Sequence, residues 1–310
     1  MVNAMNYLGA VVPVVTPCAR SGRLDEEGLR AVCDDMVAAG ASGIFVMGST
    51  GRGPWFSPQD RARAVRIARD HLPAHIPVFA GCMANGPADI LEHLTRADAE
   101  GAAFGVVTAP GYFSYLDSEI ELILLDLADR SPLPLLLYDV PVYTGTKLAV
   151  ESIVRLLSHE NIVGMKDSTA DGERLHELLD AIRDIRGAWF LQGKEHLLAE
   201  TMLAGGSGVI TTFSHFGPRP YVALCEAGRA GDRARATGIQ HHVTALYHLV
   251  TECLARRPGI STLFHMVNLA MIRRGVCANI LLEHEGPCPD WLETRATEAL
   301  ALARAALEAG

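Results

Sequence analysis

The chain of 310 residues is poor in several kinds of residue that mark particular classes of protein. Its 27 basic residues include only three lysines, Lys147, Lys166 and Lys194, and the rest are arginines. Basic residues are outnumbered by 36 acidic ones, and this acidic balance argues against a nucleic-acid-binding protein, which usually presents a basic face. Chemistry that requires a primary amine side chain therefore has three candidates.

Segments that would direct the chain into or across a membrane are also missing from the pattern. No apolar run approaches the roughly 18 residues that a membrane span needs. The first twenty residues carry no basic segment ahead of an apolar core, so we expect no secretory signal. The seven cysteines are an odd number without a C-x-x-C pair, which indicates reduced, mostly buried thiols. We therefore expect a cytoplasmic protein that contacts neither membranes nor nucleic acid.

Short apolar runs alternate with amphipathic stretches from the start of the chain. With 49% apolar and 20% charged residues, the chain is typical of a globular protein with a large core. The pattern predicts eight strands, at Gly9–Val15, Gly43–Met47, Pro77–Ala80, Ala103–Thr108, Leu133–Tyr138, Ile162–Lys166, Ala188–Leu191 and Gly208–Thr211. It predicts helices between them, at Asp25–Ala39, Pro58–His71, Pro87–Glu100, Ser118–Asp129, Leu148–Ser158, Asp171–Ile185 and Glu195–Ala204.

Such alternation is typical of parallel strands joined by helical crossovers. Eight units favour a closed (β/α)₈ (TIM) barrel over an open doubly wound sheet, and no G-x-G-x-x-G follows the first strand. After Pro220 the strand pattern stops and helical stretches fill the rest of the chain. We predict a catalytic barrel over residues 1–220 and a C-terminal helical extension, packed on the barrel, over residues 221–310.

Lys166 is the most informative residue of this pattern. In a barrel enzyme the reactive groups lie at the carboxyl ends of the strands, and Lys166 ends the sixth predicted strand. Burial is costly for a lysine unless it is paired or functional, and it lowers the pKa so that a neutral amine can attack a carbonyl and form a Schiff base. The alternative is a structural lysine that pairs with Asp139 or Asp167.

Two further features lie at neighbouring strand ends. Tyr138 ends the fifth predicted strand, where its phenol could carry protons for such chemistry, although on its position alone a core tyrosine is the more common case. The turn Gly48-Ser49-Thr50-Gly51 follows the second strand. Its amides and hydroxyls could hold a carboxylate or a phosphate, or its glycines could serve only the backbone turn.

Together these segments resemble the superfamily of N-acetylneuraminate lyase and dihydrodipicolinate synthase. Gly48-Ser49-Thr50-Gly51 is similar to its G-[ST]-T-G-E loop, and Gly164-Met165-Lys166-Asp167-Ser168 to its G-x-K-D-[ST] motif. The stretch from Tyr138 to Gly145 is similar to its Y-N-x-P-x-x-T-G segment. The three motifs occur in the family's order, and the similarity extends over most of the barrel.

The resemblance implies a fold, a reaction and a set of site residues. Lys166 forms a Schiff base with a pyruvate-type 2-oxo acid, Ser49 and Thr50 hold its carboxylate, and Tyr138 relays protons. The partner substrate is a small aldehyde, and no metal or organic cofactor is implied. Tyr112 matches a family tyrosine that reaches into a neighbouring subunit's site. The family is typically a homotetramer built as a dimer of dimers, and we expect the same here.

The chain departs from the family pattern at three positions. Arg52 replaces a glutamate, Asp139 replaces an asparagine, and Tyr143 replaces the arginine that holds the aldehyde's carboxylate in dihydrodipicolinate synthases. Because of the last change we disfavour lysine biosynthesis and expect an aldolase for a substrate such as a 2-keto-3-deoxy sugar acid. The expected substrate-binding residues are Gly48, Ser49, Thr50, Tyr143, Ser168, Gly193, Glu195 and Thr212.

Other functions stay open at this point. Within the superfamily, the reaction could be a condensation like that of dihydrodipicolinate synthase, or a dehydration. Outside it, the chain could be a phosphate-binding barrel enzyme, with the Gly205-Gly206-Ser207-Gly208 segment at the phosphate, although these glycines precede the eighth strand. It could also be a non-catalytic protein that binds a 2-oxo acid.

Overall fold

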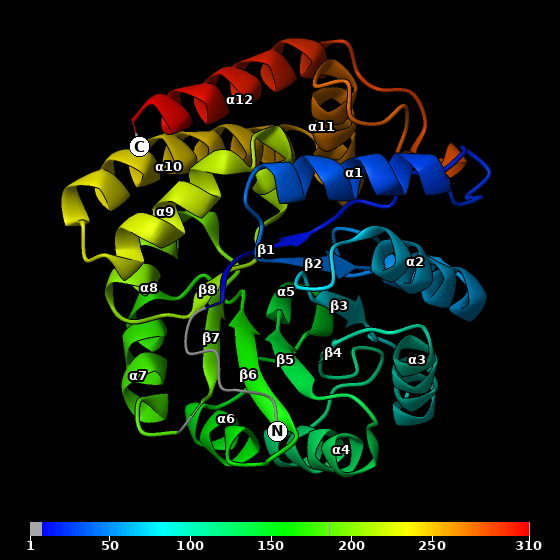
Figure 1. Ribbon diagram of the computed structural model, residues 1–310, viewed down its shortest axis with the longest axis vertical. Coiled ribbons are helices and arrows are strands. Elements are labelled where there is room, and N and C mark those ends of the chain that lie inside the picture. The colour runs from blue at the N-terminus through cyan, green and yellow to red at the C-terminus, as the bar shows by residue number, and fades with distance from the viewer. Residues whose placement is uncertain (1–7, 186, 310) are drawn as a thin grey trace.

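The computed structural model describes residues 8–185 and 187–309, and they form a closed barrel of eight parallel strands (Figure 1). Neighbours in the barrel are consecutive in sequence, and β8 pairs with β1 to close it. The strands are β1 (Gly9–Pro13), β2 (Gly43–Val46), β3 (Val78–Gly81), β4 (Phe104–Val107), β5 (Leu135–Asp139), β6 (Ile162–Asp167), β7 (Trp189–Gln192) and β8 (Gly208–Val209). The predicted (β/α)₈ fold with a helical extension is confirmed.

Helices surround the barrel and fill the chain after it. The α-helices are α1 (Glu26–Ala38), α2 (Pro58–His71), α3 (Pro87–Ala99), α4 (Asp117–Arg130), α5 (Pro141–Thr144), α6 (Val150–Leu157), α7 (Gly172–Ile182), α8 (Leu198–Leu203), α9 (Arg219–Arg229), α10 (Arg233–Arg256), α11 (Ile260–Arg273) and α12 (Trp291–Glu308). The described residues also form four 3₁₀ turns. Three of them, η1 (Gly53–Trp55), η2 (Glu195–Leu197) and η3 (Thr212–Phe216), follow β2, β7 and β8, and η4 (Glu283–Glu285) lies between α11 and α12.

Local sequence signals explain where several helices begin. The Ser57 hydroxyl accepts the amide of Asp60 at 3.1 Å, and Pro58 occupies the first position of α2. Asp25 and Asp171 accept amides in the same way at the starts of α1 and α7. These caps satisfy amides that have no partner within the helix, so each helix starts at a defined residue after its strand.

The core has two layers, one inside the barrel and one between the barrel and its helices. Large rings fill the inside: Phe79 stacks on Phe104 at 4.7 Å between centroids, and Trp189 meets Phe104 edge-on at 5.2 Å. Aliphatic residues of the outer strand faces pack against the helices in the second layer. Because apolar side chains fill the inside of the barrel, the polar side chains of a site are expected at its mouth.

The last helices lie together along one side of the barrel, opposite α4 and α6 (Figure 1). Helix α9 contacts β1 and β8, and α12 packs on α10 and α11. Over the residues that the structure describes, no helix is both long and apolar enough to span a membrane. The domain boundary at residue 220 stays a prediction.

The eighth strand and the fifth loop differ from the sequence prediction. Strand β8 has only two residues, which pair with β1 and β7, whereas the pattern predicted it to Thr211; the 3₁₀ turn η3 then begins at Thr212. The sequence also missed α5, a four-residue helix that has Pro141 at its first position. Both differences lie at the mouth of the barrel, where the chain leaves the regular sheet.

Candidate active site

Lys166 and Tyr138 lie side by side at the carboxyl ends of two adjacent strands. The two residues are register partners in the pairing of β5 with β6. The Lys166 side chain is 5% exposed, and its Nζ atom lies 4.0 Å from the centroid of the Tyr138 ring. The Phe45 ring is 5.7 Å from the same nitrogen. The amine therefore sits in an aromatic pocket at the mouth of the barrel.

The environment of Lys166 favours the neutral amine. Burial lowers its pKa to about 7, and the positive charge of Lys194 acts in the same direction. The negative charge of Glu195 partly opposes them. No carboxylate pairs with Lys166 among the described residues: Asp139 and Asp167, the partners of the structural alternative, both bind Arg174 instead. A buried amine with this pKa is a nucleophile near neutral pH.

The Tyr138 hydroxyl connects the lysine to two neighbouring loops. It hydrogen-bonds with Ser49, which follows β2, and with Ser168, which follows β6. Burial raises the pKa of Tyr138, and these two hydrogen bonds partly counteract that effect. The phenol thus lies between Ser168, in the loop that follows Lys166, and the turn after β2 that was predicted to hold a carboxylate.

The turn from Gly48 to Gly51 is fixed by close contacts. Thr16 donates its hydroxyl hydrogen to the Gly51 carbonyl at 2.7 Å, and the hydroxyls of Thr50 and Thr212 are 2.7 Å apart. A Cβ atom at Gly48 would lie 2.6 Å from the Phe45 ring. Because the turn has no room to adjust, its amides and hydroxyls are held ready for a ligand.

The loop after β7 completes the cluster from the opposite side. A Cβ atom at Gly193 would lie 2.1 Å from Ser168 Oγ and 2.9 Å from Lys166 Cε, so only glycine permits this approach. Glu195 is buried at 6% exposure, which raises its pKa to about 7. Backbone amides of Glu195 and Phe213 and the charges of Lys194 and Lys166 oppose that rise. A buried carboxyl of this kind can accept or donate a hydrogen bond to a ligand hydroxyl.

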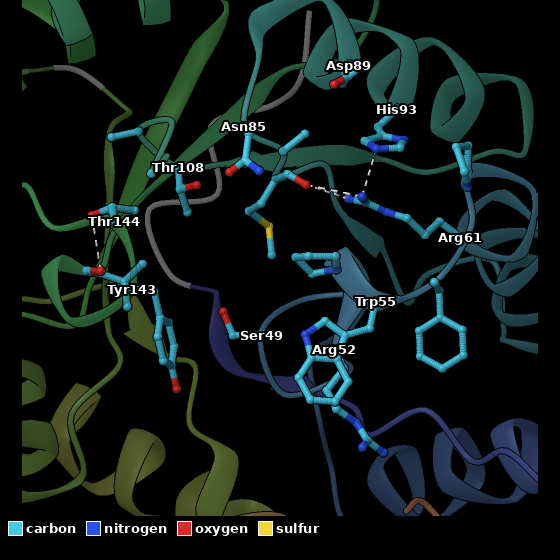
Figure 2. Close-up of a pocket in the computed structure, with 18 of the residues that line it drawn as sticks. Ser49, Arg52, Trp55, Arg61, Asn85, Asp89, His93, Thr108, Tyr143 and Thr144 are labelled. Atoms are coloured by element: carbon cyan, nitrogen blue, oxygen red, sulfur yellow. Dashed lines mark hydrogen bonds between the residues drawn. The ribbon is translucent and has the colours of Figure 1, made fainter. Parts of the chain in front are cut away.

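A cavity of about 640 Å³ opens beside this cluster (Figure 2). Figure 2 shows Tyr143 and Thr108 on one side of it and Arg61 and His93 on the other, with Ser49 between them. Neither Lys166 nor Tyr138 belongs to its lining residues. We therefore take the polar cluster around Lys166 as the candidate reaction centre, and Ser49 and Tyr143 as the residues that connect it to the cavity.

Tyr112 lies apart from this cluster in its own chain. It is 73% exposed in the loop between β4 and α4, where its ring meets Phe113 edge-on at 4.8 Å. The other expected site residues, Gly48, Ser49, Thr50, Ser168, Gly193, Glu195 and Thr212, come from the loops after β2, β6, β7 and β8. Tyr143, in α5, is 54% exposed and lines the cavity.

Arg174 is a structural partner that the sequence analysis missed. Its guanidinium donates to Asp139 Oδ2 at 2.7 Å and to Asp167 Oδ1 at 3.0 Å, and all three side chains are buried. Two carboxylates at neighbouring strand ends require a cation nearby, and the first basic residue after them is Arg174 in α7. That requirement is the signal that could have identified it.

Metal-binding groups do not gather at this site. Over the ranges 8–185 and 187–309, no cluster of three or more histidine, cysteine, aspartate or glutamate side chains is arranged to hold a metal ion. The groups that do gather around Lys166 are a phenol, hydroxyls and a carboxyl.

Comparison with known proteins supplies the family context of this site. Residues 6–282 match the model of the Dihydrodipicolinate synthetase family. The 4-hydroxy-tetrahydrodipicolinate synthase of Azoarcus sp. (strain BH72) is 33% identical over 245 residues, which cover 79% of this chain and 83% of that protein. YagE of Escherichia coli K12, whose assignment as a 2-dehydro-3-deoxy-D-gluconate aldolase is provisional, is 31% identical over 77% of this chain and 80% of its own.

The solved structures agree with the sequence matches. The crystal structure of YagE in complex with pyruvate superposes with a TM-score of 0.86 at 26% identity, and it covers 96% of this chain and 99% of that one. Nearly the whole chain thus shares one architecture with a protein crystallised with a 2-oxo acid.

Proposed function

We propose that this chain, which belongs to the dihydrodipicolinate synthetase family, is a lyase that joins a pyruvate-type 2-oxo acid to Lys166 as a Schiff base. The observation that carries the proposal is the placement of Lys166: a buried amine that pairs with no carboxylate of the described residues, beside Tyr138, with Ser49 on the other side of the phenol. Of the chain's three lysines, Lys147 pairs with Asp171 on the surface and Lys194 is half-buried, so neither shares this setting.

The reaction follows from the chemistry of these groups. The Lys166 amine attacks the C2 ketone, and the resulting carbinolamine loses water to give an iminium. Tyr138 donates the proton that leaves with that water and recovers one from the substrate's C4 hydroxyl. The iminium accepts the electron pair of the C3–C4 bond, which breaks to release an aldehyde and leave an enamine. Protonation at C3 and hydrolysis then release pyruvate and the free lysine.

The carboxylate of the 2-oxo acid has a matching site in the turn after β2. Ser49 and Thr50 present hydroxyls and backbone amides there, and Gly48 keeps the turn close to the barrel. Ser168 and Gly193 follow β6 and β7, and Gly193 lies against both Ser168 and the Lys166 side chain. In this arrangement the substrate ketone faces Lys166 while its far end points outward.

The far end of the substrate is best matched by hydroxyl groups. Glu195 and Thr212 can bind hydroxyls, and Tyr143 offers a phenol rather than a guanidinium. We therefore propose a 2-keto-3-deoxy sugar acid as the substrate class. Condensation of pyruvate with an aldehyde, or dehydration of such an acid, uses the same iminium and is the second candidate within the family.

A homotetramer, built as a dimer of dimers, is part of this proposal. Tyr112 and Phe113 project from the loop before α4 and are more than half exposed, an arrangement that suits contact with a second copy. In such a dimer Tyr112 reaches the neighbouring subunit's site.

Borohydride trapping tests the function directly. With pyruvate and borohydride, the peptide that contains Lys166 should gain the mass of a reduced pyruvyl group, and Lys166→Met should gain none. A screen of 2-keto-3-deoxy sugar acids should then find one that releases pyruvate, and Tyr138→Phe should suppress that release. Absence of an adduct at saturating pyruvate overturns the proposal, while an adduct without turnover of any tested acid favours a binding protein.

A further inference from the structure

Arg52 belongs to the same turn as the residues that we propose to bind the carboxylate. Its amide donates to the Ser49 carbonyl at 3.1 Å, and the next amide, of Gly53, donates to the Gly48 carbonyl at 3.0 Å. Arg52 adopts a left-handed conformation with φ of 53°, which is unfavourable for a side-chain-bearing residue and must be held by its surroundings. The position of Arg52 is therefore coupled to that of Ser49 through two short hydrogen-bonded turns.

The Arg52 side chain reaches away from the barrel into the C-terminal helices. Its Nη1 atom lies 2.5 Å from Glu285 Oε2, and the two side chains are 3% and 1% exposed. The guanidinium carbon lies 4.4 Å from the centroid of the Phe264 ring in α11 and 5.7 Å from that of Trp55 in η1. Figure 2 shows the guanidinium beneath the Trp55 ring, turned away from the cavity centre.

Glu285 is itself held in place at the other end of the contact. Its Oε2 atom also accepts the Leu282 amide at 2.7 Å, and its backbone carbonyl meets His265 Nε2 at 3.2 Å. Among the described residues, Arg52 Nε and Nη2 and Glu285 Oε1 have no hydrogen-bond partner. Each charge thus depends on the other for its compensation, and loss of either leaves the remaining charge buried and unpaired.

From these contacts we infer that the Arg52–Glu285 pair is a strut through which the C-terminal helices position the Ser49–Thr50 turn. Both are positioning residues: neither touches the reacting atoms, and both act through the backbone of the turn. The helical extension is then part of the 2-oxo acid site rather than a separate cover. The effect of the pair on the turn's geometry is independent of the proposed function, whereas its consequence for ligand binding rests on the proposed function.

Two measurements on Glu285→Gln test the strut. The first is hydrogen exchange at the amides of Arg52 and Gly53 in the free protein, which we expect to accelerate about tenfold when the pair is lost. The second is borohydride trapping of pyruvate at Lys166. We expect the half-saturating pyruvate concentration to rise about tenfold while the maximal trapping rate changes less than about twofold. The double variant Arg52→Glu with Glu285→Arg should restore most of the wild-type amide protection and of the wild-type half-saturating pyruvate concentration.

Asp35→Asn supplies a matched control. Asp35 in α1 accepts two hydrogen bonds from Arg274 Nη2, at 2.6 and 2.7 Å, and so also ties the barrel to the C-terminal segment, but among the described residues neither Asp35 nor Arg274 hydrogen-bonds directly to the turn. It should destabilise the fold without changing either readout.

The outcomes separate the strut from the function. If Glu285→Gln alters the hydrogen exchange of the two amides no more than Asp35→Asn does, the Arg52–Glu285 pair does not position the turn and the inference is wrong. If exchange accelerates but half-saturation stays unchanged, the extension does not serve the ligand site. If the wild-type chain traps no pyruvate, the proposed function fails. The hydrogen-exchange measurement on the free protein still tests whether the Arg52–Glu285 pair positions the turn.

Discussion

Lys166 and Glu195 are two buried groups at the barrel mouth, each with a pKa of about 7. Imine formation needs the neutral amine, so the rate of pyruvate trapping should rise through about pH 7 and level off above it. The negative charge of Glu195 raises the pKa of Lys166. Glu195→Gln should therefore move the midpoint of the rate–pH curve to lower pH, measured with cyanoborohydride across neutrality.

Glu200→Gln is the control for this shift, because Glu200 is exposed on α8 and pairs with His176. Its curve should match that of the wild type. A midpoint that stays in place or rises in Glu195→Gln would contradict electrostatic coupling between the two buried groups.

Gly193 is required by the closeness of the loop after β7 to Lys166. Gly193→Ala places a methyl group within 2.9 Å of Lys166 Cε and 2.1 Å of Ser168 Oγ, so one of these groups must move. We expect at least about a tenfold loss in the rate of pyruvate trapping, since displacement by about 1 Å is costly for a positioned nucleophile. Gly172→Ala is the matched control, because its methyl group meets only Leu197 at 3.8 Å. Equal trapping rates in both variants would refute this requirement.

At the level of secondary-structure elements, Arg174 in α7 ties together the ends of β5 and β6. Burial raises the pKa of Asp139 to about 6, against the opposing effect of Arg174. A folded-state pKa above the ordinary value of 3.8 means that the carboxyl stabilises the fold when protonated and that this contribution is lost as pH rises through 6.

The exchange Asp139→Asn removes that titration and keeps Arg174 paired with Asp167. We expect the variant to be more stable than the wild type by about 1–2 kcal/mol above pH 7, and the difference to fade towards pH 4. Arg174→Met should instead destabilise the fold by about 3–5 kcal/mol, because two buried carboxylates lose their cation. Urea unfolding at several pH values measures both. A loss of stability in Asp139→Asn at pH 8 would show that the Asp139–Arg174 ion pair stabilises the fold by more than the burial of the Asp139 carboxylate destabilises it.

The regular elements could be predicted from the sequence because their signals are local. Apolar runs and caps such as Ser57 place the strands and helices to within a few residues. The four-residue helix α5 has too few residues to show a period. The shortness of β8 depends on where its neighbours β1 and β7 run, which no local pattern encodes.

The candidate site could be predicted only where a residue's position in its strand fixes its direction. Lys166 and Tyr138 are such residues, since both end strands of the barrel. The partner of Arg52 could not be predicted, because it comes from an element 233 residues away in sequence. Pairing at that range depends on how complete helices pack, and this is settled by the fold as a whole.

At the scale of the whole molecule, apolar side chains gather on the surface near the barrel mouth. Tyr112, Phe113 and Leu116 precede α4, and Val142 and Tyr143 lie in α5; each is more than half exposed. The two segments adjoin, since a Cβ atom at Gly111 would lie 3.3 Å from the Tyr143 carbonyl. We call these five residues the apolar patch, and a patch of this kind is typical of a surface that another protein covers.

If a second copy covers the apolar patch, charge placed there must separate the subunits. In sedimentation velocity we expect the wild type to have a mass above the 33.3 kDa of the monomer. The double variant Phe113→Glu with Val142→Glu should have the mass of the monomer, because two carboxylates cannot be buried unpaired. Leu307→Glu, at an exposed position of α12, should leave the assembly intact. Since Tyr112 is expected to complete the neighbour's site, the monomeric variant should also lose turnover while it still traps pyruvate. A monomeric wild type with full turnover would show that each barrel works alone.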